Sequence, residues 1–229
     1  MSSTLFQEFL QNISQKPLLV LDSSIPNSKY IPIDLSEDNL QLKDIDVSKV
    51  EVLQNYIESQ IKQNNGIVGY GGYNEVRTIY KRSQHFNENN AERNIHLGVD
   101  LWIAADTPIY CPLEATVHSF KNNTNFGDYG PTIILKHTIN DMEFYTLYGH
   151  LSLASLENLE AGKHIKQGEP FATLGDATVN GNYPPHLHFE IIKDLQGFKG
   201  DYPGVCNKKD LEFYLDNCPN PELVLRFNF

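Results

Sequence analysis

The sequence lacks the features of a membrane protein or a nucleic-acid-binding protein. None of its apolar stretches approaches the ~20 residues that a transmembrane helix needs, so we expect no membrane partner. The 229 residues carry a formal net charge of -11, and an acidic balance disfavours binding to nucleic acids. Residues 1–10 contain neither a basic region nor a long apolar run, unlike a secretory signal peptide. These absences predict a cytoplasmic protein.

Cysteine is scarce, with only three residues in the chain. Cys111, Cys206 and Cys218 are odd in number and lack the paired spacing of a structural zinc site. Cys206 and Cys218 could pair with each other in principle. Without a secretion signal, however, three reduced thiols are the expected state.

A glycine-rich stretch at residues 69–73 (GYGGY) has the composition of a nucleotide-binding loop but not its spacing. The GxGxxG pattern is absent, and no Lys-Ser or Lys-Thr pair follows the glycines. We therefore predict a turn or a close approach of two backbones there, and no nucleotide cofactor.

The first 65 residues differ from the rest in the spacing of their apolar residues, which predicts two helices. Apolar residues recur at helical spacing at Leu5, Phe6, Phe9, Leu10 and Ile13. A second apolar stripe predicts a helix that begins at Ser48, with Glu51 as its capping-box partner. This helix should end at residues 64–66 (NNG).

The middle of the chain alternates between short β-rich runs and turn residues. The runs are 77–80, 97–103, 115–120, 132–137, 143–150, 170–174 and 186–192. Such spacing predicts an antiparallel sandwich or barrel rather than βαβ units. Residues 207–217 predict a short helix with Asn207 as its cap.

We therefore predict a mainly β protein (α+β overall) in three parts. Residues 1–65 would form a helical N-terminal extension. Residues 66–200 would form a β-rich domain with an antiparallel, sandwich-like or barrel-like core. Residues 201–229 would form a C-terminal helix and tail packed on that core.

Two short segments carry most of the chemical information. His96 and Asp100 lie four residues apart, and His186 and His188 lie two apart, each pair in a stretch that predicts strand. Because alternate residues of a strand share a face, the members of each pair should point the same way. If the strands are neighbours, the four groups converge on one small volume. A catalytic zinc needs such a volume, with a few N/O ligands and a place for water.

Each pair also has a structural interpretation. A His96–Asp100 hydrogen bond within a core is as plausible as a metal site. Residues 186–188, introduced by two prolines, favour metal binding or catalysis, because two buried histidines must satisfy four ring nitrogens. Spacing alone leaves open which of His186 and His188 would bind a metal.

A third segment, residues 148–152 (YGHLS), places His150 after a predicted strand and a glycine. It should therefore lie where a strand meets a loop and can face a cleft. A histidine satisfied by hydrogen bonds at a strand end is the alternative. Ordinary surface or structural roles are expected for His85, His118, His137 and His164.

Together the three segments resemble the lysostaphin-type zinc metallopeptidases, a group that includes bacterial cell-wall endopeptidases. The resemblance covers residues 93–195 and follows the family's order. It rests on HxxxD at His96 and Asp100, on YGHLS at 148–152 and on HxH at 186–188. It implies the duplicated hybrid motif fold of that family.

By that resemblance, His96, Asp100 and His188 would be the ligands of a Zn²⁺ ion. Two histidines and one aspartate leave a fourth position for water, as a catalytic site requires. His150 and His186 would be the catalytic pair that manages protons and stabilises the transition state.

The predicted function is zinc-dependent hydrolysis of amide bonds in short peptides that contain glycine or D-amino acids, as in peptidoglycan. The missing secretion signal and the unmatched first 65 residues leave two alternatives. One is an intracellular zinc hydrolase of a small amide metabolite. The other is a non-catalytic binding or scaffold module that retains the fold. Residues 69–73 and 77–82 lie where they could wall the cleft.

Overall fold

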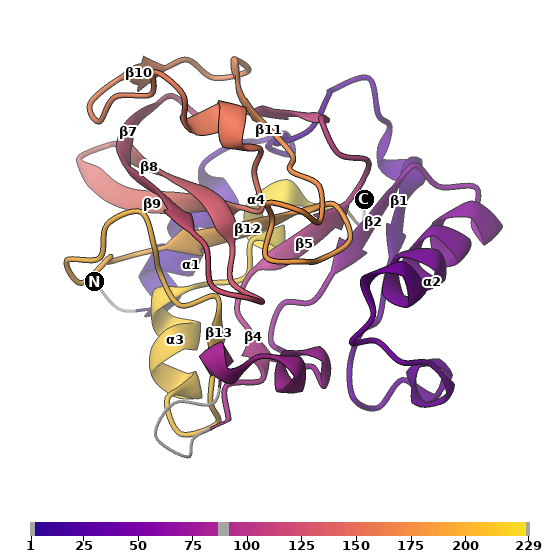
Figure 1. Cartoon of the computed structure of the whole chain (residues 1–229). Coiled ribbons are helices and arrows are strands. Elements are labelled where there is room, and N and C mark those ends of the chain that lie inside the picture. The colour runs from indigo at the N-terminus through magenta and orange to yellow at the C-terminus, as the bar shows by residue number, and fades with distance from the viewer. Residues whose placement is uncertain (1–2, 87–91, 228–229) are drawn as a thin grey trace.

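An open eight-stranded sheet forms the centre of the protein (Figure 1). The computed structural model describes residues 3–86 and 92–227. In strand order the sheet contains β1 (Tyr30–Pro32), β2 (Val68–Gly71), β5 (Val99–Trp102), β12 (His186–Ile192), β9 (Met142–Gly149), β8 (Gly130–Ile139), β7 (Ala115–Asn123) and β10 (His164–Ile165). Neighbouring strands are antiparallel except for β1 and β2. The prediction of a mainly β protein is confirmed, and the sheet stays open instead of closing into a barrel.

Two smaller sheets and several helices surround this sheet. One small sheet pairs β6 (Pro108–Tyr110) with β11 (Pro170–Thr173), and the other contains β13 (Val205–Cys206), β4 (Ile95–His96) and β3 (Glu75–Val76). The α-helices are α1 (Ser3–Asn12), α2 (Val50–Gln63), α3 (Leu211–Asn217) and α4 (Glu222–Leu225). The 3-10 helices include η1 (Asn27–Lys29), η2 (Leu40–Asp44), η3 (Ile79–Arg82), η4 (Gln84–Phe86) and η6 (Leu153–Leu156). Figure 1 places α2 beside β1 and β2, and α3 near β13.

Alternation along the two central strands β5 and β12 separates the main core from a second, mixed face. The main core takes Val99 and Leu101 of β5 and Leu187, Phe189 and Ile191 of β12, together with residues of α1 and α4. Trp102 of β5 instead joins a second apolar cluster with Leu53 and Ile57 of α2. Since neighbouring strand residues point to opposite faces, Asp100 and His188 lie on the side of Trp102.

Residues from the predicted N-terminal extension take part in the main sheet as well as in helices. β1 pairs in parallel with β2, with Tyr30 opposite Val68. Leu53 and Ile57 bury the apolar stripe of α2 against the second cluster. The division of the chain into parts at residues 65 and 200 stays a prediction, and residues 228–229 of the predicted tail lie outside the described residues.

The predicted strand at residues 77–80 is wrong. β3 ends at Val76, and the chain then turns into η3, whose residues Ile79 and Tyr80 are both buried in the second cluster. A strand would point these consecutive side chains to opposite faces. The 3-10 turn instead brings both side chains into the same cluster.

Two predicted helix starts also lie too early in the sequence. α2 begins at Val50 without a side-chain cap, because the Ser48 hydroxyl donates to Asp46 Oδ1 instead of capping the helix. α3 begins at Leu211, because the Asn207 side chain accepts hydrogen bonds from the backbone N–H groups of Lys209 and Asp210 in a preceding turn. Asn and Asp side chains commonly form such local turns in competition with helix.

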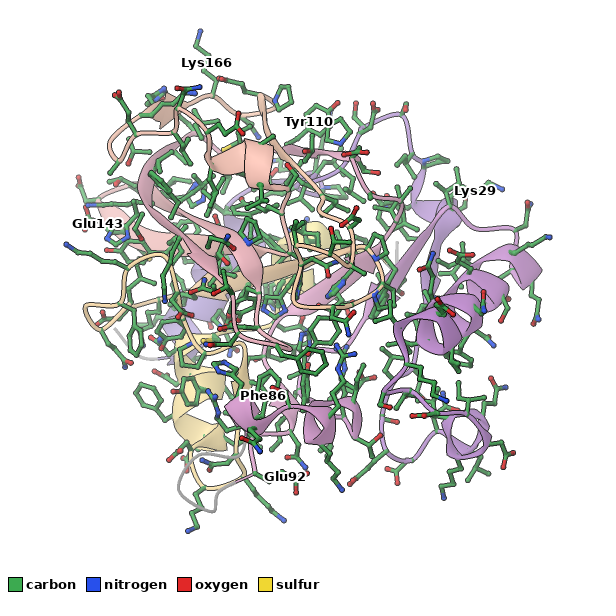
Figure 2. The ribbon with its side chains drawn as sticks, viewed as in Figure 1. Lys29, Phe86, Glu92, Tyr110, Glu143 and Lys166 are labelled. Carbon is green, nitrogen blue, oxygen red and sulfur yellow. The ribbon has the colours of Figure 1, made fainter. Side chains whose placement is uncertain are left out.

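The three cysteine thiols are buried and free, as predicted. Among residues 3–86 and 92–227, no helix combines the length and apolar character needed to cross a membrane. Charged side chains such as Lys29, Glu92 and Lys166 lie at the outside of the molecule (Figure 2). The buried exceptions among the described Arg, Lys, Asp and Glu residues are Arg77, Asp100, Asp128 and Glu190. Buried charges need partners, so these residues direct attention to one region of the structure.

Prediction: the buried imidazole of His137 makes stability depend on pH. Burial lowers the pKa of His137 to about 4 from 6.5, and its two ring nitrogens lie 3.1 Å from the Glu114 carbonyl oxygen and 2.8 Å from Thr146 Oγ1. Between these pH values the unfolded chain binds the extra proton, so the contribution is complete above pH 6.5 and is lost as the pH falls toward 4. The loss should reach about 3 kcal/mol of unfolding free energy.

Denaturant unfolding at a series of pH values measures this effect. His137→Gln should unfold with a shallower dependence on pH between 4 and 6.5 than the unmodified protein. His164→Gln is the matched control, because His164 contacts the same residue, Glu114, from an exposed position. Equal slopes for His137→Gln and the unmodified protein would refute the assignment.

Candidate metal centre

The pairing of β5 with β12 sets Asp100 directly opposite His188. The same register pairs Trp102 with His186, and the indole and imidazole rings stack at 6.1 Å. On the other side of β12, His188 pairs with Gly149 of β9. Side chains of directly opposed strand residues lie close together, so three strands bring the segments at 100, 149 and 186–188 to one place.

His96 reaches the same place by a different path from the one predicted. It lies at the end of β4 in a separate small sheet, so His96 and Asp100 do not share one continuous strand. The two side chains still converge, with His96 Nε2 3.3 Å from Asp100 Oδ1. The link between β4 and β5 passes close to His188 at Gly98, where an added Cβ would lie 2.6 Å from His188 Cε1. Only glycine permits this approach.

His150 follows Gly149 immediately after β9, as predicted. Its backbone is left-handed, with φ of 61°, and its N–H donates to the Tyr129 carbonyl oxygen at 2.9 Å. Such a conformation is uncommon outside glycine and is often found at functional sites. It turns the imidazole back over β12, where the ring lies 4.1 Å from that of His186.

Three donor atoms form a compact group at this point. His96 Nε2 lies 2.9 Å from His188 Nδ1, and Asp100 Oδ1 lies 3.3 and 3.2 Å from these two nitrogens. Ligands about 2.0 to 2.1 Å from a tetrahedral zinc would be separated by about 3.3 Å. The set of two imidazoles and one carboxylate therefore fits a metal ion in both chemistry and spacing.

Backbone carbonyls orient three of the four imidazoles. The Nδ1–H groups of His96, His150 and His186 donate to the carbonyl oxygens of Gly72, Asn180 and Pro184, at 2.8, 2.8 and 2.7 Å. A carbonyl can only accept, so each Nδ1 carries the proton and each Nε2 keeps its lone pair. Nitrogens with a free lone pair can bind a metal or accept a proton.

His188 is oriented in the opposite sense. Its Nδ1 faces Asp100, while its Nε2 lies 3.6 Å from Glu190 Oε2 and 3.5 Å from the Tyr129 hydroxyl. Glu190 is fully buried, and its carboxyl group lies behind the imidazole. Carboxylates in this position orient metal-binding histidines and increase their basicity.

Burial and neighbouring charges shift the protonation of the cluster. Burial and then the charge of Arg77 lower the pKa of His96 to about 4. Burial also lowers the pKa of both His150 and His186, which favours neutral rings. Burial acts the same way on His188, but Asp100 and Glu190 outweigh it and raise its pKa to about 9. His188 must therefore lose a proton before it can bind a metal.

Asp100 is held as a carboxylate. Burial alone would raise its pKa, but His96 and Arg77 outweigh burial, so the pKa lies well below its ordinary value. Arg77 Nη1 lies 2.6 Å from Asp100 Oδ2. Sequence analysis assigned Arg77 no role beyond a place near the cleft, and its position two residues after Glu75 is the signal that could have drawn attention to it.

All five predicted site residues line one cavity of about 180 Å³. His150 and His186 are 5% exposed, and His96, Asp100 and His188 are 2% exposed. Aromatic side chains from several segments line the cavity as well: Tyr80, Phe86, Trp102, Tyr129, Tyr183, Phe198 and Tyr202. Sequence reasoning missed Tyr129, an isolated residue in a glycine-flanked turn that carries no recognisable pattern. The expectation that residues 77–82 wall the cleft is met by Arg77, Ile79 and Tyr80, whereas none of residues 69–73 lines this cavity.

Comparisons with known proteins point to one family. Residues 94–200 match the model of peptidase family M23. None of the curated proteins matches the chain significantly. Similar solved structures include an M23 protein from Pseudomonas aeruginosa, with 20% identity and a TM-score of 0.38 over 57% of this chain and 43% of that one.

Two further solved structures are similar to this chain. The catalytic domain of the antimicrobial peptidase lysostaphin from Staphylococcus simulans shares 22% identity, with a TM-score of 0.37 over 55% of this chain and 81% of that one. A zinc-containing peptidase from Vibrio cholerae shares 25% identity, with a TM-score of 0.35 over 43% of this chain and 27% of that one. The chain thus spans less than half of the Pseudomonas and Vibrio proteins.

Prediction: removal of one donor abolishes metal binding, whereas removal of His186 does not. His188→Ala deletes one of the three clustered donor atoms. His186 Nε2 lies farther away, 3.8 Å from Asp100 Oδ1, so His186→Ala should retain the metal. The metal content of zinc-loaded, dialysed protein measures both, with exposed His164→Ala as control. Retention by His188→Ala and loss by His186→Ala would reverse the assignment.

Proposed function

Residues 94–200 match the model of peptidase family M23, and from this premise we propose that the protein is a zinc-dependent hydrolase of amide bonds. Its substrates would be short peptides that contain glycine or D-amino acids, of the kind found in peptidoglycan. The observation that carries the proposal is the group of three donor atoms spaced 2.9 to 3.3 Å apart beside two further imidazoles.

His96, Asp100 and His188 would hold the metal. His188 is favoured over His186 because its Nδ1 lies 2.9 Å from His96 Nε2, within the same small group as Asp100 Oδ1. A bound zinc ion would supply Lewis acidity, which polarises a carbonyl and makes a hydroxide nucleophile available at neutral pH. The donors are N and O atoms, which suit zinc.

His150 and His186 would manage protons and charge. Their rings lie 4.1 Å apart, and each has its Nδ1–H anchored on a backbone carbonyl. Burial keeps both rings neutral, so either Nε2 can accept a proton from the attacking water. The protonated ring can then stabilise the developing oxyanion or return the proton to the leaving amine.

The small volume of the cavity supports a short substrate over a polymer. Its volume is about 180 Å³, below the 300 Å³ at which ligand pockets usually begin. The same observation favours a second candidate, the hydrolysis of a small amide metabolite. Both candidates use the same residues, so they differ in substrate and not in chemistry.

A substrate panel tests the proposal. Zinc-loaded protein is incubated with muropeptides, glycine-rich peptides of increasing length and small amide metabolites, and products are identified by mass. Cleavage that falls as the peptide grows longer is the expected result. Turnover of small amides alone would favour the second candidate. Zinc binding without turnover of any amide would refute both and favour a binding module.

Prediction: His150→Ala retains zinc and loses turnover. The imidazole lies beside His186 and outside the group of three donors, so its loss should remove proton transfer and leave metal binding intact. General acid–base catalysis contributes about 10²- to 10⁴-fold, which sets the expected fall in kcat. The measurement combines zinc content with cleavage rates on the best substrate of the panel.

The control for this variant is His118→Ala. His118 contacts Ser119 and Tyr145, neither of which lines the cavity, so its loss should leave cleavage unchanged. Unaltered turnover in His150→Ala would contradict the proposed role. Loss of zinc together with turnover would place His150 among the ligands instead.

A further inference from the structure

We propose that Arg77 is a positioning residue that holds Asp100 to the metal through one oxygen only, and that residues 33–37 of the N-terminal segment complete this arrangement through Glu75. The inference rests on the proposed metal site. It assigns a function to a part of the chain that lies outside residues 94–200, the segment that matches the peptidase family.

The two oxygens of Asp100 face different partners. Oδ1 lies 3.3 Å from His96 Nε2, 3.2 Å from His188 Nδ1 and 3.8 Å from His186 Nε2. Oδ2 accepts a hydrogen bond of 2.6 Å from Arg77 Nη1. The two oxygens thus have different roles: Oδ1 points toward the nitrogens of His96 and His188, and Oδ2 is paired with the guanidinium of Arg77.

Arg77 is itself fixed on several sides. The residue is 4% exposed, Nε donates to Glu75 Oε2 at 2.5 Å, and the guanidinium lies 5.8 Å from the centre of the Trp102 ring. Nη1 also lies 3.4 Å from the Tyr80 hydroxyl. A planar guanidinium can bridge two carboxylates in a fixed geometry, whereas a lysine ammonium is a single point of charge.

Glu75 links this bridge to the N-terminal segment. Its Oε1 accepts a hydrogen bond of 3.1 Å from the backbone N–H of Leu35. Backbone bonds on both sides fix Leu35, since the Ile33 N–H donates to the Tyr70 carbonyl at 2.8 Å and the Glu37 N–H donates to the Val76 carbonyl at 2.9 Å. A continuous series of hydrogen bonds therefore connects the Leu35 backbone through Glu75 and Arg77 to Asp100.

This series of hydrogen bonds and ion pairs has two physical consequences for the site. A guanidinium on Oδ2 prevents that oxygen from becoming a second ligand, which preserves a coordination position for water or substrate. The buried carboxylate also keeps a partner for its full charge, because a buried oxygen without a donor would be costly. Residues that orient a ligand in this way commonly change metal affinity by about 10- to 100-fold when they are replaced.

The test compares Arg77→Met with Arg82→Met in the full chain. Arg82 is a matched control, because its guanidinium lies 4.2 Å from the Tyr183 ring and donates to the Asn182 carbonyl, but it contacts none of the three donors. Zinc affinity is measured by competition with a chromophoric chelator. The visible absorption of the Co²⁺-loaded protein reports the number of ligands, since four-coordinate cobalt absorbs more strongly than five- or six-coordinate cobalt.

Arg77→Met should bind zinc about 10- to 100-fold more weakly and give a weaker cobalt spectrum, as Oδ2 joins the ion. Arg77→Lys should fall between Arg77→Met and the unmodified protein, because it restores the charge without the bridge to Glu75. Glu75→Gln should weaken binding in the same direction, and it decides the question if Arg77→Met does not fold. Arg82→Met should match the unmodified protein in both measurements.

Unchanged affinity and spectrum in Arg77→Met or in Glu75→Gln would overturn the inference, as would an equal loss in Arg82→Met. The readouts need no turnover, so unmodified protein that binds zinc but cleaves nothing defeats the proposed function and leaves this test decisive. Unmodified protein that binds no zinc overturns both.

Discussion

The pairing of β5 with β12 is the constraint on which the rest of the centre depends. Its register places Asp100 opposite His188, and a slip of one residue would turn one of the two side chains into the apolar core. Core residues on both strands forbid that slip, since Val99 and Phe189 are fully buried on the other face. Burial of the apolar face and convergence of the polar face are thus two results of the same alternation.

The sheet sets the positions of the imidazole rings, and backbone carbonyls set their protonation. Strand pairing fixes where an imidazole is attached, but not which nitrogen carries the proton. The carbonyls of Gly72, Asn180 and Pro184 decide that question for three rings by accepting from Nδ1–H. A turn or loop supplies each of these oxygens, so the irregular segments determine the protonation pattern while the regular ones determine position. Buried rings hold such a pattern because burial disfavours the charged form.

Much of the strand content could be predicted from local alternation, whereas the convergence of the site was predicted only on the condition that the strands are neighbours, which the pairing of β5 with β12 meets. The central strand β12 carries both histidines of one motif, so spacing alone predicts their shared face. The path of His96 could not be predicted, because Gly98 separates two short strands that join different sheets. Arg77 was missed for a similar reason. Its role depends on both Asp100 and Glu75, and the local sequence does not show that an arginine in the predicted strand at 77–80 lies between two carboxylates.

The residues around the cavity come from several parts of the sequence. Residues 94–200 match the peptidase family and contain all five proposed site residues. The walls come from inside and outside this segment. Trp102, Tyr129, Tyr183 and Phe198 lie within it, residues 201–205 follow it, and the residues that precede it are Leu35, Leu53, Arg77, Ile79, Tyr80, His85, Phe86 and Arg93. Parts of the sequence outside the matched segment therefore help to complete the cavity that contains these five residues. The shape of the cavity thus depends on more of the chain than the family match covers, because residues before 94 and after 200 line it together with the five proposed site residues.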